Sequence, residues 1–408
     1  MSTEIIHESA TLKGAATDYW SRVKAGDIGA LPAILGLVVL CGIFGAMSDV
    51  FLTPGNFANL LTQAAAVIVI AMGLVFVLLL GEIDLSAGYA AGVSGAVLVI
   101  LITNHDLAWY LAFPISIMVG ALLGFVLGSL VARIGIPSFV VTLAAFLAFQ
   151  GLLLLLAGEG GTIRIEDKTI LAVENSNLSP LLSWVFFIVV AVAYVGTGLN
   201  RLNTRRRAGL KTELIKLWVI KTASLLVVTG GAVFALNVER SNNPELVSLK
   251  GIPYVVPLIL FLLAIGTFVL GRTAFGRHIY AVGGNAEAAR RAGINVKRVR
   301  ISAFVICSAL AAVAGMIFAS RQNSVSPTTG GSSTLLYAVG AAVIGGTSLF
   351  GGKGKMRDAI LGGLVVAVID NGMGLLGYAA GIKFIVTGLV LLVSAGVDAV
   401  SRRGSSVN

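Results

Sequence analysis

The stretch GRTAFGRHIYAVGGNAEAARRAGINVKRVR, residues 271–300, lies between two long apolar runs and holds seven of the chain's 29 Lys and Arg residues. Its centre, Ala286 to Ala292, consists of Ala, Glu and Arg, which favour helix, and glycines flank it on both sides. The sequence therefore predicts a short charged helix, followed by a second basic cluster, in a connection between two membrane spans.

The composition of the whole chain is that of an integral membrane protein. Hydrophobic residues make up 57% of the 408 residues and charged residues only 12%, and the mean hydropathy is +0.96. Many of the 50 glycines fall inside apolar runs, where small residues let helices approach closely. Gly120, Gly124 and Gly128 recur every four residues and predict a packing face. We expect an all-α, polytopic helical bundle.

Apolar runs of about 20 residues, the length that crosses a bilayer, set the number of helices at about ten to twelve. The runs lie near 31–50, 62–80, 87–103, 111–132, 138–157, 181–199, 217–236, 254–270, 301–320, 335–350, 359–374 and 382–399. Some of them are marginal in length, and segments 62–103 and 335–374 are those in which broken or re-entrant helices are expected.

The distribution of basic residues predicts the orientation, because Lys and Arg concentrate in cytoplasmic loops. With the amino terminus inside, 23 of the 29 fall in inward segments. Residues 1–30, which lack the apolar core of a signal peptide, and 401–408 are then cytoplasmic tails around a transmembrane domain at 31–400. The net charge of +10 fits contact with anionic lipid rather than with nucleic acid.

Two polar interruptions of the apolar runs are candidates for a translocation path or gate. In GEIDLSAG, residues 81–88, Glu82, Asp84 and Ser86 stand between two apolar runs, and Asp370 and Asn371 interrupt a later run. Two interpretations of residues 81–88 remain open: a broken helix whose polar groups line a cavity, or a tight turn whose acids favour the start of the next helix. A weak echo, GGTSLFGG, follows at 345–352.

Catalytic, cofactor and metal sites are not expected on this chain. Its two cysteines lie in apolar runs, and its three histidines are scattered in the tail and loops. The run that continues to Gly352, Lys353 and Gly354 fails the P-loop template, since Thr347 holds the place of the first glycine and Gly354 that of the Ser or Thr. We therefore expect no ATP hydrolysis by the chain itself.

Several strings together resemble the permease subunits of bacterial ABC sugar importers of the ribose and xylose type. They are GEIDLSAG, IPSFVVTLAAFLAFQG, RTAFGRHIYAVGGNAEAARRAGINV, VIGGTSLFGGKG and IDNGMGLL, in order from about residue 55 to the end. The resemblance implies a homodimer in the bacterial inner membrane, ATP-binding cassette subunits that carry the ATP, and a periplasmic sugar-binding protein. It also implies alternating access without enzymatic activity on this chain.

The same resemblance assigns the coupling helix, which seats in the ATPase, to the connection 271–300. The matching residues are Glu287, Ala288, Ala289, Arg290, Gly293, Ile294 and Asn295. A block at 181–236, with two additional apolar segments, departs from the shorter ribose-like pattern. The longer chain looks most like the xylose-type members and so implies a pentose such as D-xylose.

Two other classes of protein are weighed against this expectation. A proton-coupled secondary transporter would use Glu82, Asp84 or Asp370 as relay groups, and its uptake would collapse with a protonophore. A membrane-embedded enzyme would need a cluster of His, Cys or Asp that the sequence lacks.

Overall fold

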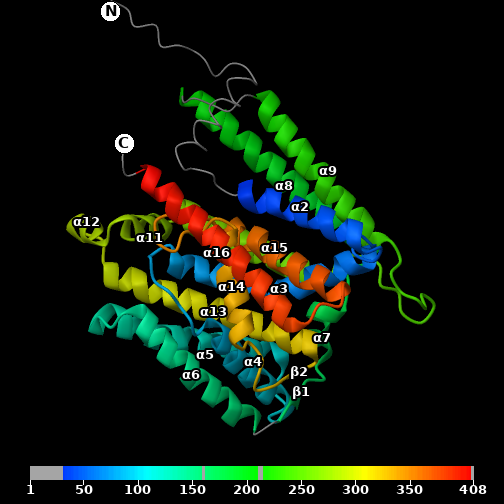
Figure 1. Cartoon of the computed structure of the whole chain (residues 1–408), viewed down its shortest axis with the longest axis horizontal. Coiled ribbons are helices and arrows are strands. Elements are labelled where there is room, and N and C mark those ends of the chain that lie inside the picture. Colours follow the sequence, from blue (N-terminus) through cyan, green and yellow to red (C-terminus); the bar gives the residue numbers. More distant parts are fainter. Residues whose placement is uncertain (1–30, 159–160, 210–214, 406–408) are drawn as a thin grey trace, which may run out of the picture. The chain divides into compact units, whose positions relative to one another are not determined.

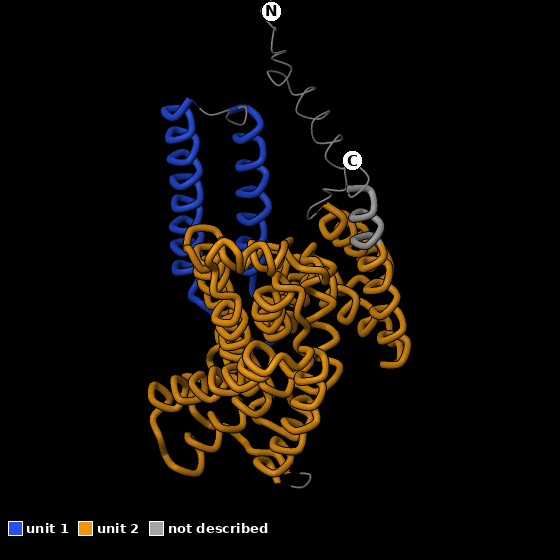
Figure 2. Tube along the Cα trace, turned by 90° about the vertical axis from the view of Figure 1, so that its left-hand side faces the viewer, with its two compact units in different colours: residues 1–28, 177–252, 400–408 blue, residues 29–176, 253–399 orange. Residues whose placement is uncertain are grey.

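The computed structural model describes residues 31–158, 161–209 and 215–405, and the side chains up to residue 396. The predicted amino-terminal tail, Lys211 and residues 406–408 lie outside the described residues. The chain forms two compact units (Figure 2). The larger unit comprises Gly29–Ser176 and Pro253–Ala399, and the described part of the smaller unit is chiefly Asn177–Ile252. The predicted extra block at 181–236 falls within the smaller unit.

The larger unit is helical apart from one short pair of strands. Its elements are α2 (Leu31–Met47), α3 (Pro54–Leu78), α4 (Ala87–Thr103), α5 (Trp109–Ser129) with a π-helical turn at Leu130–Ile134, α6 (Ser138–Ala157), β1 (Ile163–Arg164), α7 (Lys168–Asn175), α10 (Val255–Arg272), α11 (Ala274–Gly284), α12 (Ala286–Arg291), α13 (Val296–Gln322), β2 (Ser324–Val325), α14 (Ser332–Ile344), α15 (Met356–Leu375) and α16 (Ala380–Ser405). The strands pair antiparallel, with Ile163 opposite Val325.

Every predicted apolar run coincides with a helix, which confirms the all-α polytopic membrane fold. Among the described residues, eight helices are long and apolar enough to span a bilayer, and four apolar helices are shorter. Several boundaries differ by a few residues. The run 335–350 ends as a helix at Ile344, because Gly345 and Gly346 begin a turn in which Gly346 has φ +118°. α14 therefore has only 13 residues.

Helices α3 and α13 form the centre of the larger unit. In the most apolar window of α3, 78% of the residues are buried, against 22% in α6, and α13 packs on α3, α4 and α5. The glycine face of α5 lies against α13. A Cβ added at Gly124 or Gly128 would come within 2.8 Å of the α13 backbone, at Val305 and Ile301 respectively. The predicted packing role of this face is thus confirmed.

The outer helices expose large apolar side chains, as expected of a surface that faces lipid rather than water. Met118 and Leu122 on α5, and Leu147 and Leu155 on α6, are all more than 60% exposed. Helices α11 and α12 lie at one end of the larger unit, which we call the α12 end (Figure 1). The opposite end, with α7 and the β1–β2 pair, is the α7 end.

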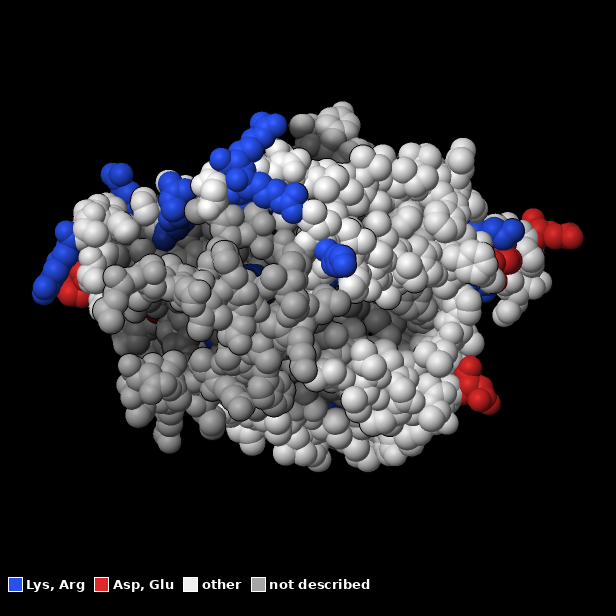
Figure 3. Space-filling view, turned by 90° about the horizontal axis from the view of Figure 1, so that it is seen from above, with Lys and Arg blue, Asp and Glu red and all other residues white. Residues whose placement is uncertain are grey.

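The smaller unit is a helical hairpin of α8 (Pro180–Arg207) and α9 (Ile215–Asn237). Trp218 covers Gly198 and Phe187 covers Gly230, so the two helices pack through small residues. Most other apolar side chains are exposed, and α8 ends in Arg205, Arg206 and Arg207. Figure 3 shows one face of the chain, with Lys and Arg gathered on one part of it and a broad area without charge beside them. The basic end of α8 and the exposed apolar side chains of the two helices are typical of a hairpin that crosses a membrane.

The connection from α9 to α10 is organised by Glu239. Its carboxylate accepts hydrogen bonds from the amides of Arg240, Ser241 and Leu249, at 2.9–3.0 Å, and from the Ser248 hydroxyl at 2.8 Å. The backbone hydrogen bonds, those of Leu249 and Ser241 first, lower the pKa of Glu239 to about 2. The loop is therefore held in one shape although it is exposed to solvent.

Candidate functional site

The predicted coupling helix is α12, which has six residues, Ala286–Arg291, one fewer than expected. A helix this short is marginal on its own, so its caps and packing must hold it. The Asn285 side chain accepts a hydrogen bond from the Ala288 amide at 2.9 Å, and Ala289 is buried against the unit. Ala288, by contrast, is exposed.

The exposed side of α12 carries three charged groups that bind one another. Glu287 pairs with Arg290 at 2.9 Å and with Arg291 at 3.2 Å. The hydrogen bonds from Arg290 and Arg291 lower the pKa of Glu287. Both arginine side chains remain more than 70% exposed, so a partner can still reach them.

The chain leaves α12 by a sharp turn at Gly293, whose φ of +85° is a conformation that favours glycine. The Ile294 amide bonds the Ala289 carbonyl at 3.0 Å and fixes this turn. Asn295 then caps α13 by accepting a hydrogen bond from the Arg298 amide at 3.0 Å. The seven residues predicted for coupling thus form one continuous structure between α11 and α13; their coupling role stays a prediction.

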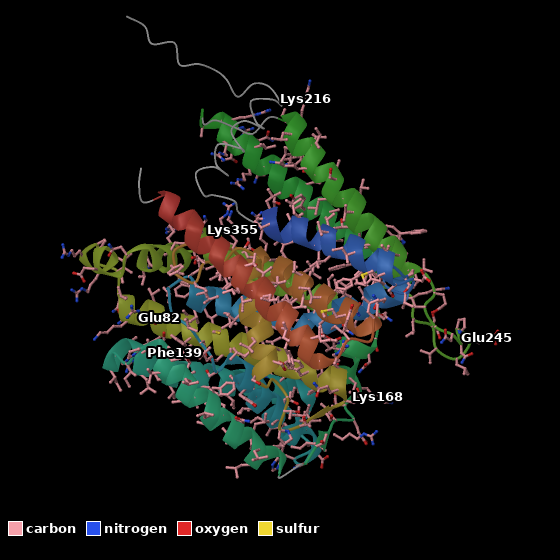
Figure 4. The ribbon with its side chains drawn as sticks, viewed as in Figure 1. Glu82, Phe139, Lys168, Lys216, Glu245 and Lys355 are labelled. Atoms are coloured by element: carbon pink, nitrogen blue, oxygen red, sulfur yellow. The ribbon has the colours of Figure 1, made fainter. Side chains whose placement is uncertain are left out.

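The predicted gate residues 82, 84 and 86 lie in the loop Leu79–Ser86 between α3 and α4, at the α12 end (Figure 4). Asp84 is fully buried, and its Oδ1 accepts hydrogen bonds from the Ser86 amide at 2.9 Å and from the Ser86 hydroxyl at 2.6 Å. A carboxylate just before the first turn of α4 has the geometry of the tight-turn interpretation.

The Glu82 side chain pairs with Arg300 of α13, with 3.1 Å between its Oε1 and the Arg300 Nε. Both side chains are largely buried. The same loop is tied to α6, since the Ile83 amide donates to the Ser138 hydroxyl at 3.3 Å and the Thr142 hydroxyl to the Ile83 carbonyl at 3.1 Å. The loop is a packed junction of several helices.

Asp370 and Asn371 lie elsewhere. Asn371 exchanges two hydrogen bonds of 2.9 Å with Asn56, at the start of α3, whereas the loop with Glu82 follows the end of that helix. The 25 residues of α3 place these two sites roughly 36 Å apart. Asp370 pairs with Lys383 of α16 at 3.5 Å. The five candidate gate residues therefore form two separate clusters, not one site.

A buried carboxyl group that the sequence did not single out lies at the α7 end. Glu174 of α7 is 8% exposed, and neither of its carboxyl oxygens has a hydrogen-bond partner among the described residues. Burial raises the pKa of Glu174 to about 8, against the opposing charge of Arg321. The sequence does contain a signal for the start of α7, because the Asp167 side chain accepts hydrogen bonds from the amides of Thr169 and Ile170 and so caps the helix.

No cluster of three or more His, Cys, Asp or Glu that could hold a metal occurs among the residues that the structure describes. Glu82 pairs with Arg300 at the α12 end, and Asn56 pairs with Asn371 at the other, so these contacts are suited to holding helices and loops in register. An exposed charged helix joined to a packed junction can transmit a movement from a partner.

Residues 56–395 match the family described as branched-chain amino acid transport system, permease component. The chain belongs to this permease family. It is a multi-pass transport subunit and not an enzyme.

The chain is 35% identical to the xylose transport system permease protein XylH of Escherichia coli K12, over 95% of both chains, and 32% identical to XylH of Haemophilus influenzae, over 94% of this chain and 99% of that one. It is 28% identical to the ribose import permease protein RbsC of Haemophilus influenzae, over 90% of this chain and 92% of the relative. No solved structure matches.

Proposed function

We propose that this permease is the membrane subunit of an ATP-driven importer that moves a monosaccharide into the bacterial cytoplasm. The single observation that carries the proposal is α12, a short helix whose one side is anchored by the buried Ala289 while Ala288 and both arginines face outward. Such a helix in a connection between two spans can seat in a cleft of a soluble subunit. The α12 end is then cytoplasmic.

We infer a pentose, D-xylose in particular, as the substrate. The xylose permeases share more identity and more length with the chain than the ribose permeases do. A periplasmic binding protein would deliver the sugar at the α7 end.

Import would proceed by alternating access between two copies of this chain. ATP binding closes the cassette subunits, and α12 moves with them. This movement changes the side of the membrane to which the path between the spans is open. The ATP stays on the partner subunit. Asp84 and Glu82 would shape the junction next to the path rather than bind a neutral sugar.

Docking on α12 is tested by pull-down of the tagged chain from its native membrane in mild detergent. Wild type should recover an ATP-binding cassette subunit, and Ala288→Trp, which adds bulk to the exposed side of α12, should lose it. Ala379→Trp is the matched control, since Ala379 is an exposed alanine between α15 and α16 at the other end of the larger unit. Recovery with all three proteins would place docking elsewhere.

A further inference from the structure

Three backbone segments from distant parts of the chain meet at the α12 end. They are the end of α11, the loop Leu79–Ser86 between α3 and α4, and the loop Gly345–Lys355 between α14 and α15. The Gly352 amide donates a hydrogen bond of 2.8 Å to the Leu79 carbonyl and so joins the two loops. The two sequence segments that echo each other, at 81–88 and 345–352, are thus neighbours in space.

Gly283, near the end of α11, closes this junction. A Cβ added at Gly283 would overlap the Leu79 carbonyl oxygen and lie 2.8 Å from the Gly352 nitrogen. The contact is therefore between backbones, with no flexible side chain that could absorb a displacement. Closely packed interiors have low compressibility and transmit strain, so a shift of α11 must move both loops.

Helix α11 is in turn joined firmly to α12. Asn285 ends α11, with its amide bonded to the Ala281 carbonyl, and the same residue caps α12 with its side chain. Earlier in α11, the Tyr280 hydroxyl donates a hydrogen bond of 2.8 Å to the carbonyl of Gly354. This bond ties α11 to the loop before α15 a second time.

The other side of α12 leads to the same place. Through Gly293 and the cap at Asn295, α12 continues into α13, whose Arg300 pairs with Glu82 in the loop Leu79–Ser86. Both chain directions out of α12 therefore converge on the loop that connects α3 to α4. Helix α3 is the most buried span of the larger unit.

We propose that Gly283, Tyr280 and Arg300 are positioning residues that relay a displacement of α12 to the α3–α4 and α14–α15 loops, and so couple ATP hydrolysis to opening of the path. The inference rests on the proposed function. It adds the contacts by which a movement would leave the docking helix and reach the spans.

The test compares Gly283→Ala with Gly284→Ala in the complete importer, reconstituted with its ATP-binding subunit and binding protein. Gly284 is the matched control because a Cβ there would meet nothing within 4 Å. The measurements are the amount of ATP-binding subunit that copurifies, ATP hydrolysis, and the number of sugars imported per ATP hydrolysed.

Gly283→Ala should keep the ATP-binding subunit and its hydrolysis but lower the sugars imported per ATP about tenfold, within the range of measured couplings between distant sites. Gly284→Ala should resemble wild type. A merely structural role would lower hydrolysis and import together. Import per ATP at the wild-type level in Gly283→Ala would overturn the relay.

A second variant covers the case in which Gly283→Ala does not fold. Tyr280→Phe removes only the hydroxyl that bonds Gly354, and Tyr378→Phe, at an exposed tyrosine after α15, is its control. Tyr280→Phe should also reduce import per ATP, and an unchanged ratio would count against the relay. Failure of the wild-type complex to bind the ATP-binding subunit or to import sugar would contradict the proposed function itself.

Discussion

At the scale of single residues, the neighbouring side chains of Asp370 and Asn371 on α15 make different kinds of contact. The buried Asn371 exchanges two hydrogen bonds with Asn56, and its amide also reaches the Gln63 side chain at 3.3 Å. Asp370, one residue earlier, makes a partly exposed ion pair with Lys383. The first arrangement joins α15 to the start of α3, while the second lies at the margin of the fold.

Asn371→Ala should lower the free energy of unfolding by about 1–3 kcal/mol, because it leaves the buried amide of Asn56 with unmade hydrogen bonds. Asp370→Asn is the matched control, and loss of a partly exposed ion pair should cost at most about 1 kcal/mol. Thermal unfolding of both variants in detergent measures the difference. Equal melting temperatures would mean that the Asn56–Asn371 pair does not hold α15 in place.

Glu174 predicts a pH dependence of stability. Its pKa of about 8 in the folded chain exceeds the value of about 4.3 for an exposed glutamate, so the folded state binds the proton more tightly. The stabilisation that this tighter proton binding gives the folded state is fully present below about pH 4. It is lost as the pH rises towards 8, and the free energy of unfolding then falls by at most about 1.4 kcal/mol per pH unit.

Glu174→Gln should remove this dependence, so that its melting temperature exceeds that of wild type at pH 8 and the difference shrinks at pH 5. Glu166→Gln, at an exposed carboxylate in the same connection, should keep the wild-type slope. If the melting temperatures of wild type and Glu174→Gln change with pH in the same way between pH 5 and 8, Glu174 is not buried in the folded protein.

At the scale of elements, the sequence predicts helices well where apolar length decides and poorly where capping decides. The runs 87–103 and 138–157 coincide with α4 and α6. Helix α3 begins eight residues before its predicted run, since Thr53 and Pro54 start it although Asn56 and Asn59 are polar. The tertiary bond to Asn371, which no local pattern reveals, accounts for the buried Asn56.

In the candidate site, too, local features could be predicted from the sequence and long-range contacts could not. Residues 286–295 could be recognised as a short charged helix with a glycine exit, because these features are local. The burial of Asp84, the pairing of Glu82 with Arg300 and the contact of Gly283 with Leu79 depend on segments about 200 residues apart in sequence. The echo between 81–88 and 345–352 was a weak signal for the meeting of two loops that the structure shows.

At the scale of the whole molecule, the larger unit has a docking helix and a packed junction at one end and a polar cluster with a buried carboxyl group at the other. Apolar helices connect the two ends and expose their side chains towards lipid. This division fits a transporter in which the substrate enters at one end and an ATP-driven subunit acts at the other. The α8–α9 hairpin has exposed apolar side chains of its own.

The central claim, ATP-driven import of a pentose, is tested most directly by uptake of radiolabelled D-xylose into proteoliposomes. The vesicles carry the chain with its ATP-binding subunit, with ATP inside and the sugar-binding protein outside. We predict that uptake of D-xylose requires ATP, exceeds uptake of ribose and continues in the presence of a protonophore. Uptake that a proton gradient drives without ATP, and that a protonophore abolishes, would contradict the account and favour a proton-coupled transporter.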